Sequence, residues 1–261
     1  MEDLVSKLRT QVAQIIDGQC SPDGPGFAGA PFGLAELRDD LDRLAQMVAE
    51  REATRKALAL EVHHRVKNNL QIITSLLDMQ ASRIENPAAH EALGQTRARI
   101  GALALINRVH FEQADDGSNA TLDVARLISE LCSQFRVWNR SRTEIVFSCN
   151  AAATLVPLDN ALPLALFAVE AVTNAYAYAF PDQRGGSVRL HFSVTDDGDA
   201  VLSVTDDGIG FDSTSNDGSL GRQLMQGFAR QLGGSYVIIS EAGDGTEARL
   251  DYRIGMSEIT A

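Results

Sequence analysis

The sequence predicts an α+β protein in which a helical hairpin is followed by an α/β sandwich with a mostly antiparallel sheet. From about residue 34 to residue 113, apolar side chains recur every three or four positions, the spacing of amphipathic helices. From about residue 120, short apolar strands bounded by turn residues alternate with helical segments. With 261 residues, 44% of them hydrophobic, the chain can hold one large domain or two small ones.

Residues 1–53 are predicted to form a helical arm and linker. A first set of apolar residues follows helical spacing: Leu4, Leu8, Val12 and Ile15. The Gly- and Pro-rich stretch 17–33 interrupts the pattern as a flexible connector. A second set forms a seam typical of a coiled coil: Leu34, Leu37, Leu41, Leu44 and Val48. The arm would be a coiled coil or a partner-binding segment, and an ordinary amphipathic helix of a monomer is the alternative.

Residues 54–115 are predicted to form a hairpin of two long helices. The helical pattern runs to about Ile84, Asn86 and Pro87 mark a turn, and a second helix covers about 88–113. Because a hairpin alone has too little core, we expect it to bury its apolar stripe against a second copy, as a four-helix bundle in the dimer.

Residues 116–261 are predicted to form the α/β sandwich. We expect a first helix, capped by Thr121 with Asp123 near its positive end, and then a strand in TEIVFS. The remaining elements are a helix at 159–180, strands on both sides of the turn 196–199, a helix at 219–232, and strands at about 235–240 and 246–254. Strands that follow one another around short turns favour an antiparallel sheet with helices on one side.

The charge and the cysteines exclude several classes of protein. The net charge is −12, and neither nucleic acid nor an anionic membrane attracts a strongly acidic surface. No signal peptide is apparent, and no apolar run approaches the ~20 residues that span a bilayer, so we expect a cytoplasmic protein. Cys20, Cys132 and Cys149 lack paired-ligand spacing and are expected to be free thiols in a reducing compartment.

The stretch EVHHRVKNNLQ, residues 61–71, places two adjacent histidines at different positions around one helix. At about 100° per residue, one face is apolar: Val62, Val66, Leu70, Ile73, Leu76 and Leu77. The opposite face is polar: His64, Lys67, Asn68, Gln71, Ser75 and Asp78. We therefore expect His64 to project to solvent and His63 to be partly packed. A neutral imidazole can act as a nucleophile, and Glu61 can hydrogen-bond one of its ring nitrogens.

Glu170 and Asn174 are polar residues in a helix otherwise apolar enough to be buried. They stand four positions apart and so share one face of that helix. Because burying unpaired polar groups is costly, they form either a mutually bonded structural pair or a functional one. In the functional interpretation the Asn174 amide binds Mg²⁺, and the Glu170 carboxylate positions water or the metal.

The stretch SVTDDGIGFD delivers Asp206 from a strand to the edge of a cavity. There Gly208 and Gly210 would let the chain approach a ligand closely. The glycines of GSLGRQLM, Gly218 and Gly221, open a helix whose N-terminal amides can face phosphates. Neither a Walker loop nor an EF-hand loop occurs in the sequence.

Together these stretches resemble a sensor histidine kinase of the HisKA_2 and HWE-like group. HRVKNN resembles the HRxxN signature of that group. EAVTNAYAYAF, DDGIGF and GSLGRQL resemble the N, G1 and G2 boxes of a Bergerat-type (GHKL) ATP-binding domain. The resemblance covers roughly residues 54–255, with the four motifs in the family's order.

The resemblance implies a role for each matching residue. His64 would be phosphorylated, and Asn68 matches a position that aids dephosphorylation of the partner regulator in some kinases. Asn174 would hold Mg²⁺ with Glu170 beside it, and Asp206 would accept a hydrogen bond from the adenine amino group. The ATP pocket would also include Gly208, Gly210, Gly218, Leu220, Gly221 and Thr246, with about 212–221 as its lid.

The N box departs from the family pattern at two positions. A basic residue usually stands three after the Asn and is followed by His, where this chain has Ala177 and Tyr178. A lost cation near the phosphates would weaken ATP binding or slow transfer, and Arg222 or Arg184 would be the replacement. In addition, Arg65 follows His64 where the commonest kinase class has an acid, and residues 1–53 are too short for a sensor domain.

The sequence thus predicts a cytoplasmic, homodimeric histidine kinase that uses ATP and Mg²⁺. It would autophosphorylate His64 and pass the phosphoryl group to an aspartate of a response-regulator receiver domain in two-component stress signalling, with input from an upstream sensor protein. The alternative is a degenerate kinase that acts as a histidine phosphotransferase, a response-regulator phosphatase or a scaffold. A third class, the Hsp90- or MutL-like ATPases, would share the pocket but would not need an exposed His64.

Overall fold

The computed structural model describes residues 31–113, 121–138, 144–211 and 219–254. The chain divides into two units, Met1–His64 and Arg65–Ala261. The predicted first helical segment at 1–17 and most of the connector at 17–33 therefore lie outside the described residues.

Two long helices occupy the predicted hairpin region, α2 (Pro31–Ala81) and α3 (Pro87–Gln113). Asn86 caps α3, because its Oδ1 accepts a hydrogen bond of 3.2 Å from the Ala89 amide. The predicted turn at Asn86 and Pro87 is confirmed. α2 begins at Pro31, so the last three residues of the predicted connector are helical instead, and α2 ends at Ala81 rather than near Ile84.

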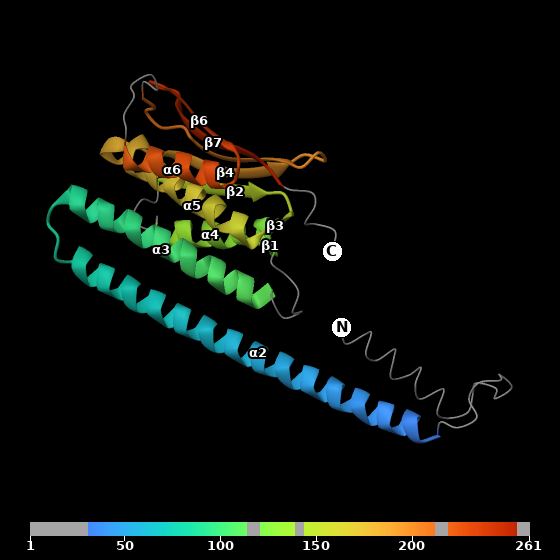
Figure 1. Ribbon diagram of the computed structural model, residues 1–261. Helices are drawn as coiled ribbons and strands as arrows, with labels where there is room; N and C mark the ends of the chain where they lie inside the picture. The colour runs from blue at the N-terminus through green and yellow to red at the C-terminus, as the bar shows by residue number, and fades with distance from the viewer. Residues whose placement is uncertain (1–30, 114–120, 139–143, 212–218, 255–261) are drawn as a thin grey trace. The chain divides into compact units, whose positions relative to one another are not determined.

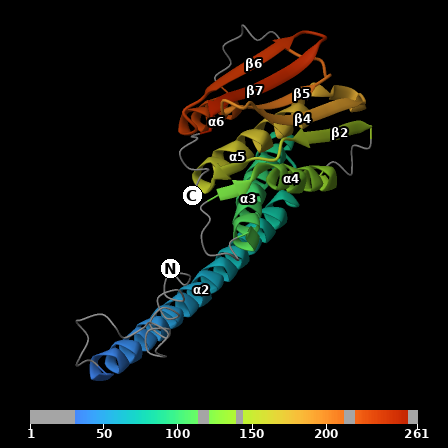
Figure 2. The same ribbon diagram turned by 90° about the vertical axis from the view of Figure 1, so that its right-hand side faces the viewer.

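Five strands form one sheet in the order β2-β4-β5-β7-β6 (Figures 1 and 2). They are β2 (Ile145–Ala151), β4 (Gly186–Val194), β5 (Asp199–Asp206), β6 (Ser235–Glu241) and β7 (Gly245–Arg253). β2 pairs in parallel with β4, and the other three pairings are antiparallel, as predicted for most of the sheet. Two further short strands, β1 (Thr121–Asp123) and β3 (Leu155–Pro157), pair with each other.

Three helices cover one face of the sheet: α4 (Val124–Trp138), α5 (Leu158–Asn174) and α6 (Leu220–Gln231) (Figures 1 and 2). Alternate residues of β4 and β5 are buried on that face, because successive side chains of a strand point to opposite sides. α5 is the most deeply buried helix, with apolar side chains such as Leu164 and Phe167 shielded from solvent. The prediction that the helices lie on one side of the sheet is confirmed.

The prediction that Thr121 caps a helix is wrong. Thr121 begins strand β1 and pairs with Pro157, while Asp123 sits at the start of α4. The Asp123 Oδ1 accepts a hydrogen bond of 2.9 Å from the Ala125 amide. The short strand was missed because its only support is β3, which comes after α4 and β2 in the chain.

The expectation of free thiols is also wrong for two of the three cysteines. Cys132 of α4 and Cys149 of β2 form a disulfide. They are 17 positions apart, so no short motif marks them, but the packing of α4 against β2 brings their Cα atoms to 6.6 Å. Cys20 lies outside the described residues.

One face of α3 is part of the sandwich core. Five of its residues are at most 4% exposed and belong to the same buried cluster as the sheet and α4–α6: Ala98, Ala102, Leu105, Ile106 and Val109. The expectation that a second copy covers the apolar stripe of the hairpin does not hold for this face, because the chain covers it itself. The predicted stripe of α2 is open in the single chain, with Val62 52%, Ile73 42% and Leu76 54% exposed.

If α3 is integral to this core, truncating Leu105 must destabilise the whole sandwich. We expect Leu105→Ala to lower the free energy of unfolding by about 2–5 kcal/mol, because a fully buried Leu loses its contacts and leaves a cavity. Leu155→Ala is the matched control, since Leu155 is 47% exposed. Urea unfolding of both variants measures the difference, and equal losses would show that α3 is not part of the core.

Candidate functional site

Glu170 is a buried carboxylate held by an arginine from another helix. Glu170 lies on α5, and the residue is only 1% exposed. Arg99 of α3 donates two hydrogen bonds to Glu170 Oε2, from Nε at 3.0 Å and from Nη2 at 2.7 Å. A buried charge needs such a partner, because an unpaired one costs several kcal/mol. Arg99 was missed by the sequence analysis, since a lone arginine in an amphipathic helix carries no signal of its distant partner.

Gly221 lies directly against the two polar residues of α5. A Cβ atom added at Gly221 would stand 2.6 Å from Glu170 Oε1 and 3.2 Å from Asn174 Nδ2. Only glycine therefore allows the first turn of α6 to come this close. The structure thus brings together Glu170, Asn174 and Gly221, three of the residues that the sequence analysis singled out. Leu220, the first residue of α6, is exposed, and Gly218 lies outside the described residues.

α5 continues into a π-helical turn, Ala175–Ala179. Such turns are rare and frequently occur at functional sites. This turn carries Ala177 and Tyr178, the two departures from the N-box pattern. The Tyr178 side chain interacts with Glu91 and Gln95 of α3, and its pKa is raised by burial and by the charge and hydrogen bond of Glu91.

Asp206 ends β5 as a buried carboxylate, 7% exposed. Its Oδ1 accepts a hydrogen bond of 3.0 Å from the Gly208 amide, and it lies opposite Thr246 of β7. Burial raises the pKa of the Asp206 carboxyl, and the backbone amides of Gly208 and Thr246 partly oppose the rise. Since a carboxylate has several lone pairs, Asp206 retains capacity to accept a further hydrogen bond from a ligand.

Close backbone packing holds the loop after Asp206 against the π turn that follows α5 and against β7. The Ile209 amide donates a hydrogen bond of 3.0 Å to the Ala179 carbonyl, and a Cβ atom at Gly208 would overlap Ala179. Gly245 has φ +81°, and its carbonyl accepts a hydrogen bond of 2.9 Å from Ser240 Oγ. The hydroxyls of Ser240 and Thr246 are 2.9 Å apart. Gly208 and Thr246 thus lie beside Asp206, as predicted, and Gly210 belongs to the same loop.

The two arginines considered as replacements for the missing N-box cation are placed differently. Arg222 follows Gly221, and its guanidinium lies 4.9 Å from the centre of the Phe211 ring. Arg184 donates a hydrogen bond of 3.1 Å to the Asp207 carbonyl. Arg222 therefore belongs to the helix turn whose Gly221 lies against Glu170 and Asn174, while its guanidinium lies over the Phe211 ring.

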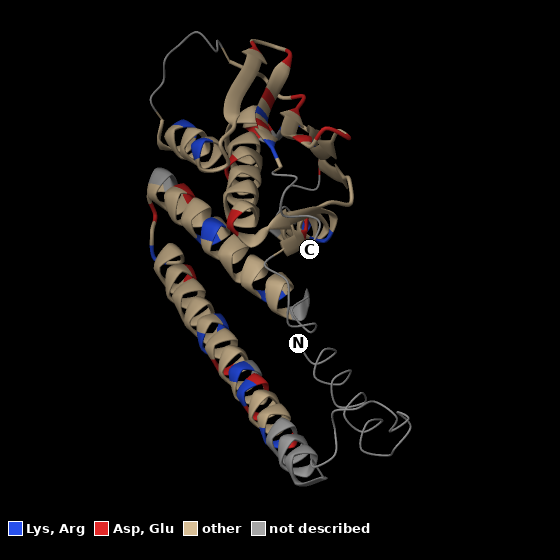
Figure 3. Cartoon of the chain, turned by 45° about the vertical axis from the view of Figure 1, so that its right-hand side comes forward, with Lys and Arg blue, Asp and Glu red and all other residues tan. Residues whose placement is uncertain are grey.

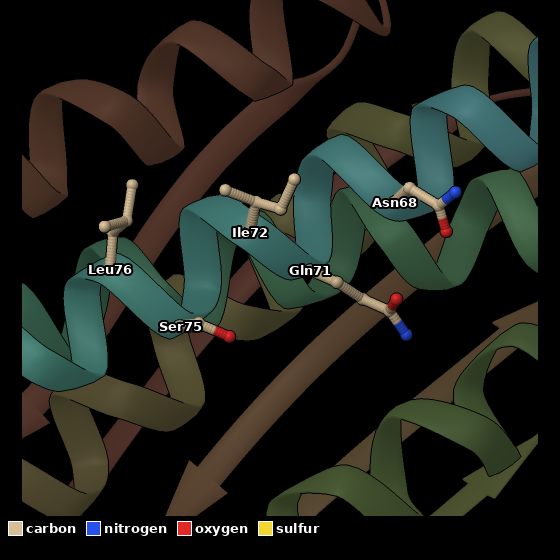
Figure 4. A pocket seen from close by; sticks show the side chains of 5 residues that line it. All are labelled: Asn68, Gln71, Ile72, Ser75 and Leu76. Carbon is tan, nitrogen blue, oxygen red and sulfur yellow. The ribbon is translucent and has the colours of Figure 1, made fainter.

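The histidine face on α2 has the predicted orientation. His64 is exposed and His63 is half-buried, with their ring centroids 5.9 Å apart. Glu61, one turn earlier, is also exposed. Further along, an open pocket on α2 is lined by Asn68, Gln71, Ile72, Ser75 and Leu76 (Figure 4). Figure 4 shows Gln71 and Ser75 directed to one side of the helix and Ile72 and Leu76 to another. Asn68, Gln71 and Ser75 belong to the predicted polar face.

Charged residues are distributed unevenly over these elements. Figure 3 shows interspersed basic and acidic residues along α2, basic residues on α6 and acidic residues at turns of the sheet. None of the helices in the described part of the chain has a stretch that is both long and apolar enough to span a bilayer.

Comparison with known proteins finds two family domains in the chain. Residues 61–138 match the HisKA_2 family, described as histidine kinase, and residues 140–244 match the histidine kinase-like ATPase domain. The chain is 31% identical to the sensor histidine kinase PdtaS of Mycolicibacterium smegmatis over 155 residues, which is 58% of this chain and 30% of that protein. The chain therefore spans under a third of PdtaS.

Two further relatives come from Erythrobacter litoralis. Blue-light-activated histidine kinase 2 is 28% identical over 206 residues, covering 73% of this chain and 55% of that protein. The solved histidine kinase domain of the blue-light-activated kinase EL346 is 27% identical, with a TM-score of 0.56 over 76% of this chain and 94% of that structure. The fold similarity thus extends from the helical region through the sheet.

A pair of glycines in α6 tests the close approach of this helix to α5. Gly227→Ala should raise the free energy of unfolding by about 0.5–1 kcal/mol, because Gly227 has open space around it and alanine favours a helix interior. Gly221→Ala should instead lower it by about 1–3 kcal/mol, because the new methyl group overlaps Glu170 and displaces it or the helix turn. Urea unfolding measures both, and a gain in both variants would contradict the packing at Gly221.

Proposed function

Since the chain belongs to the histidine kinase family, we propose that it is an ATP-dependent autokinase that phosphorylates His64 and passes the phosphoryl group to an aspartate of a response regulator. The observation that carries the proposal is the convergence of Glu170, Asn174 and Gly221 at the first turn of α6. The family resemblance implies that Asn174 holds Mg²⁺ with Glu170 beside it and that Gly221 borders the ATP pocket, and the observed geometry is compatible with these roles.

The residues present fit a magnesium nucleotide. The side-chain oxygen of Asn174 is a hard donor suited to Mg²⁺, and Gly221 keeps the space beside it free of a side chain. The α6 N-terminus offers backbone amides for phosphates, and Asp206 offers an acceptor for an adenine amino group. Bound Mg²⁺ would neutralise charge on the phosphate oxygens during transfer.

In the proposed reaction, an unprotonated ring nitrogen of His64 attacks the γ-phosphorus. A nitrogen–phosphorus bond forms, the bond from phosphorus to the β–γ bridging oxygen breaks, and ADP leaves with that electron pair. Glu61, one turn before His64, would hydrogen-bond the other ring nitrogen and take up its proton as general base. A receiver-domain aspartate then accepts the phosphoryl group, and Asn68, one turn after His64, would assist the reverse, dephosphorylating activity.

The proposal includes a homodimer through the phosphoacceptor hairpin at 54–115, a catalytic domain at 116–261, and the N-terminal arm at 1–53 as the site of input from a sensor protein. The exposed apolar stripe of α2 supports the dimer, because Val62 and Leu76 are open in the single chain. We further propose a cytoplasmic location and a role in two-component stress signalling.

One observation favours the alternative of a degenerate kinase. Tyr178, where the family pattern has His, interacts with Glu91 and Gln95 of α3, and Ala177 supplies no cation for phosphates. In this second candidate, the hairpin acts as a histidine phosphotransferase, a regulator phosphatase or a scaffold without the ATP step.

The test is incubation of the purified protein with γ-labelled ATP and Mg²⁺. We expect acid-labile label on the wild type, none on His64→Ala and none on Asn174→Ala, because these lack the acceptor and the metal ligand. His63→Ala is the matched control and should keep its label, since His63 is the half-buried neighbour. An unlabelled wild type that still binds ATP would support the alternative, and label on His64→Ala would reject the assignment of the acceptor.

Asp206→Asn should change nucleotide affinity and stability in opposite directions. The pKa of Asp206 is raised in the folded protein, so the folded state binds this proton more tightly than the unfolded chain does. Ionisation of Asp206 therefore lowers the stability as pH rises from the unfolded-state pKa to the folded-state pKa. The variant should therefore unfold at a higher temperature at pH 7 and lose this advantage in acid. Its affinity for Mg·ADP should fall by about 10-fold or more, because an amide presents fewer acceptor sites than a carboxylate. Calorimetry and thermal unfolding measure both, and unchanged affinity would remove Asp206 from the adenine site.

A further inference from the structure

We propose that Arg99 is a positioning residue for phosphorylation, and that its ion pair with Glu170 ties the geometry of the nucleotide site to helix α3. The inference rests on the proposed function, because the orientation of Glu170 affects the reaction only if Glu170 acts beside bound Mg·ATP. Arg99 itself would touch neither nucleotide nor metal.

The two oxygens of Glu170 are used differently. Oε2 accepts both hydrogen bonds from Arg99, at 3.0 and 2.7 Å. Oε1 points toward Gly221, where an added Cβ atom would stand 2.6 Å away, and Asn174 borders the same space. Arg99 therefore fixes the carboxylate by one oxygen and leaves the other directed at the place where phosphates and Mg²⁺ are proposed to bind.

α3 follows the polar edge of α5 for at least two turns. On α3, Glu91, Gln95 and Arg99 are four positions apart, and on α5 and its π turn Glu170, Asn174 and Tyr178 are spaced in the same way. Arg99 pairs with Glu170, and Tyr178 interacts with Glu91 and Gln95, so the two rows run antiparallel. Figures 1 and 2 show the two helices side by side. Tyr178, one of the two departures from the N-box pattern, thus faces α3.

The packing of the apolar face of α3 in the core determines where along α5 the Arg99 side chain lies. Ala98 and Ala102, on either side of Arg99, are buried in the core of the sandwich, so α3 cannot slide without disturbing that core. A rigid guanidinium fork then transmits any small shift of α3 to Glu170 Oε2, which a flexible lysine ammonium would do less well. Because α3 follows the helix that carries His64, Arg99 links the two halves of the proposed kinase.

The experiment compares Arg99→Met with Arg108→Met in the full chain. Arg108 is the matched control, because it lies on the same helix and pairs with Glu130 of α4 at 2.9 Å, away from the N box. At saturating ATP, we expect Arg99→Met to lower the initial rate of His64 labelling by about 10- to 100-fold, while its Kd for Mg·ADP stays within about threefold of the wild type. Arg99→Lys should recover part of the rate, and Arg108→Met should match the wild type in both.

A second pair of variants covers the case in which Arg99→Met leaves Glu170 unpaired and unfolds the protein. In Arg99→Met/Glu170→Gln no buried charge is left without a partner, so this double variant should fold. If Arg99 acts through Glu170, the double variant should label at the same residual rate as Glu170→Gln alone.

Three results would overturn the inference. One is an Arg99→Met rate equal to or above that of Arg108→Met. Another is that Arg99→Met loses labelling rate and Mg·ADP affinity to the same extent and also unfolds at a lower midpoint than Arg108→Met. That result would mean that the Arg99–Glu170 ion pair has a purely structural role. The third is a further loss in the double variant beyond Glu170→Gln. A wild type that carries no label would instead reject the proposed function, and this inference with it, so the two failures are distinguishable.

Discussion

The buried charge of Glu170 constrains how the neighbouring helix α3 can pack. A carboxylate inside an apolar helix layer must have a partner, and Arg99 reaches it only because α3 packs along α5. The apolar face of α3 provides this packing, with Leu105 and Val109 fully buried further along the helix. Core packing and charge pairing therefore support the same arrangement of α3 and α5.

Small residues shape the site on its opposite side. Gly221 lets α6 approach Glu170 and Asn174, and Ala179 leaves just enough room for the Gly208 loop that follows Asp206. The π turn after α5 connects these two regions, since its last residue accepts the hydrogen bond from Ile209. The polar residues of the site are thus positioned by the close backbone packing around them.

α2 differs from the rest of the described chain because its apolar residues remain largely uncovered. Leu58 and Ile72 are exposed along with the predicted stripe, while the corresponding face of α3 is buried. The two helices of the predicted hairpin are therefore not equivalent: α3 is part of the sandwich core, and α2 carries the histidine face and the surface proposed for a second copy. Through α3, the predicted hairpin is in contact with the proposed nucleotide site at Glu170.

The sequence by itself determined the elements that depend on local pattern. The helical periodicity defined α2 and α3, turn residues located the hairpin of β4 and β5, and the position of His64 around its helix followed from the residue spacing. The tertiary structure alone decided which distant groups meet: Arg99 with Glu170, Cys132 with Cys149, and β1 with β3. Each of these pairs joins residues far apart in the chain, and their proximity results from how amphipathic faces pack, which no single segment specifies.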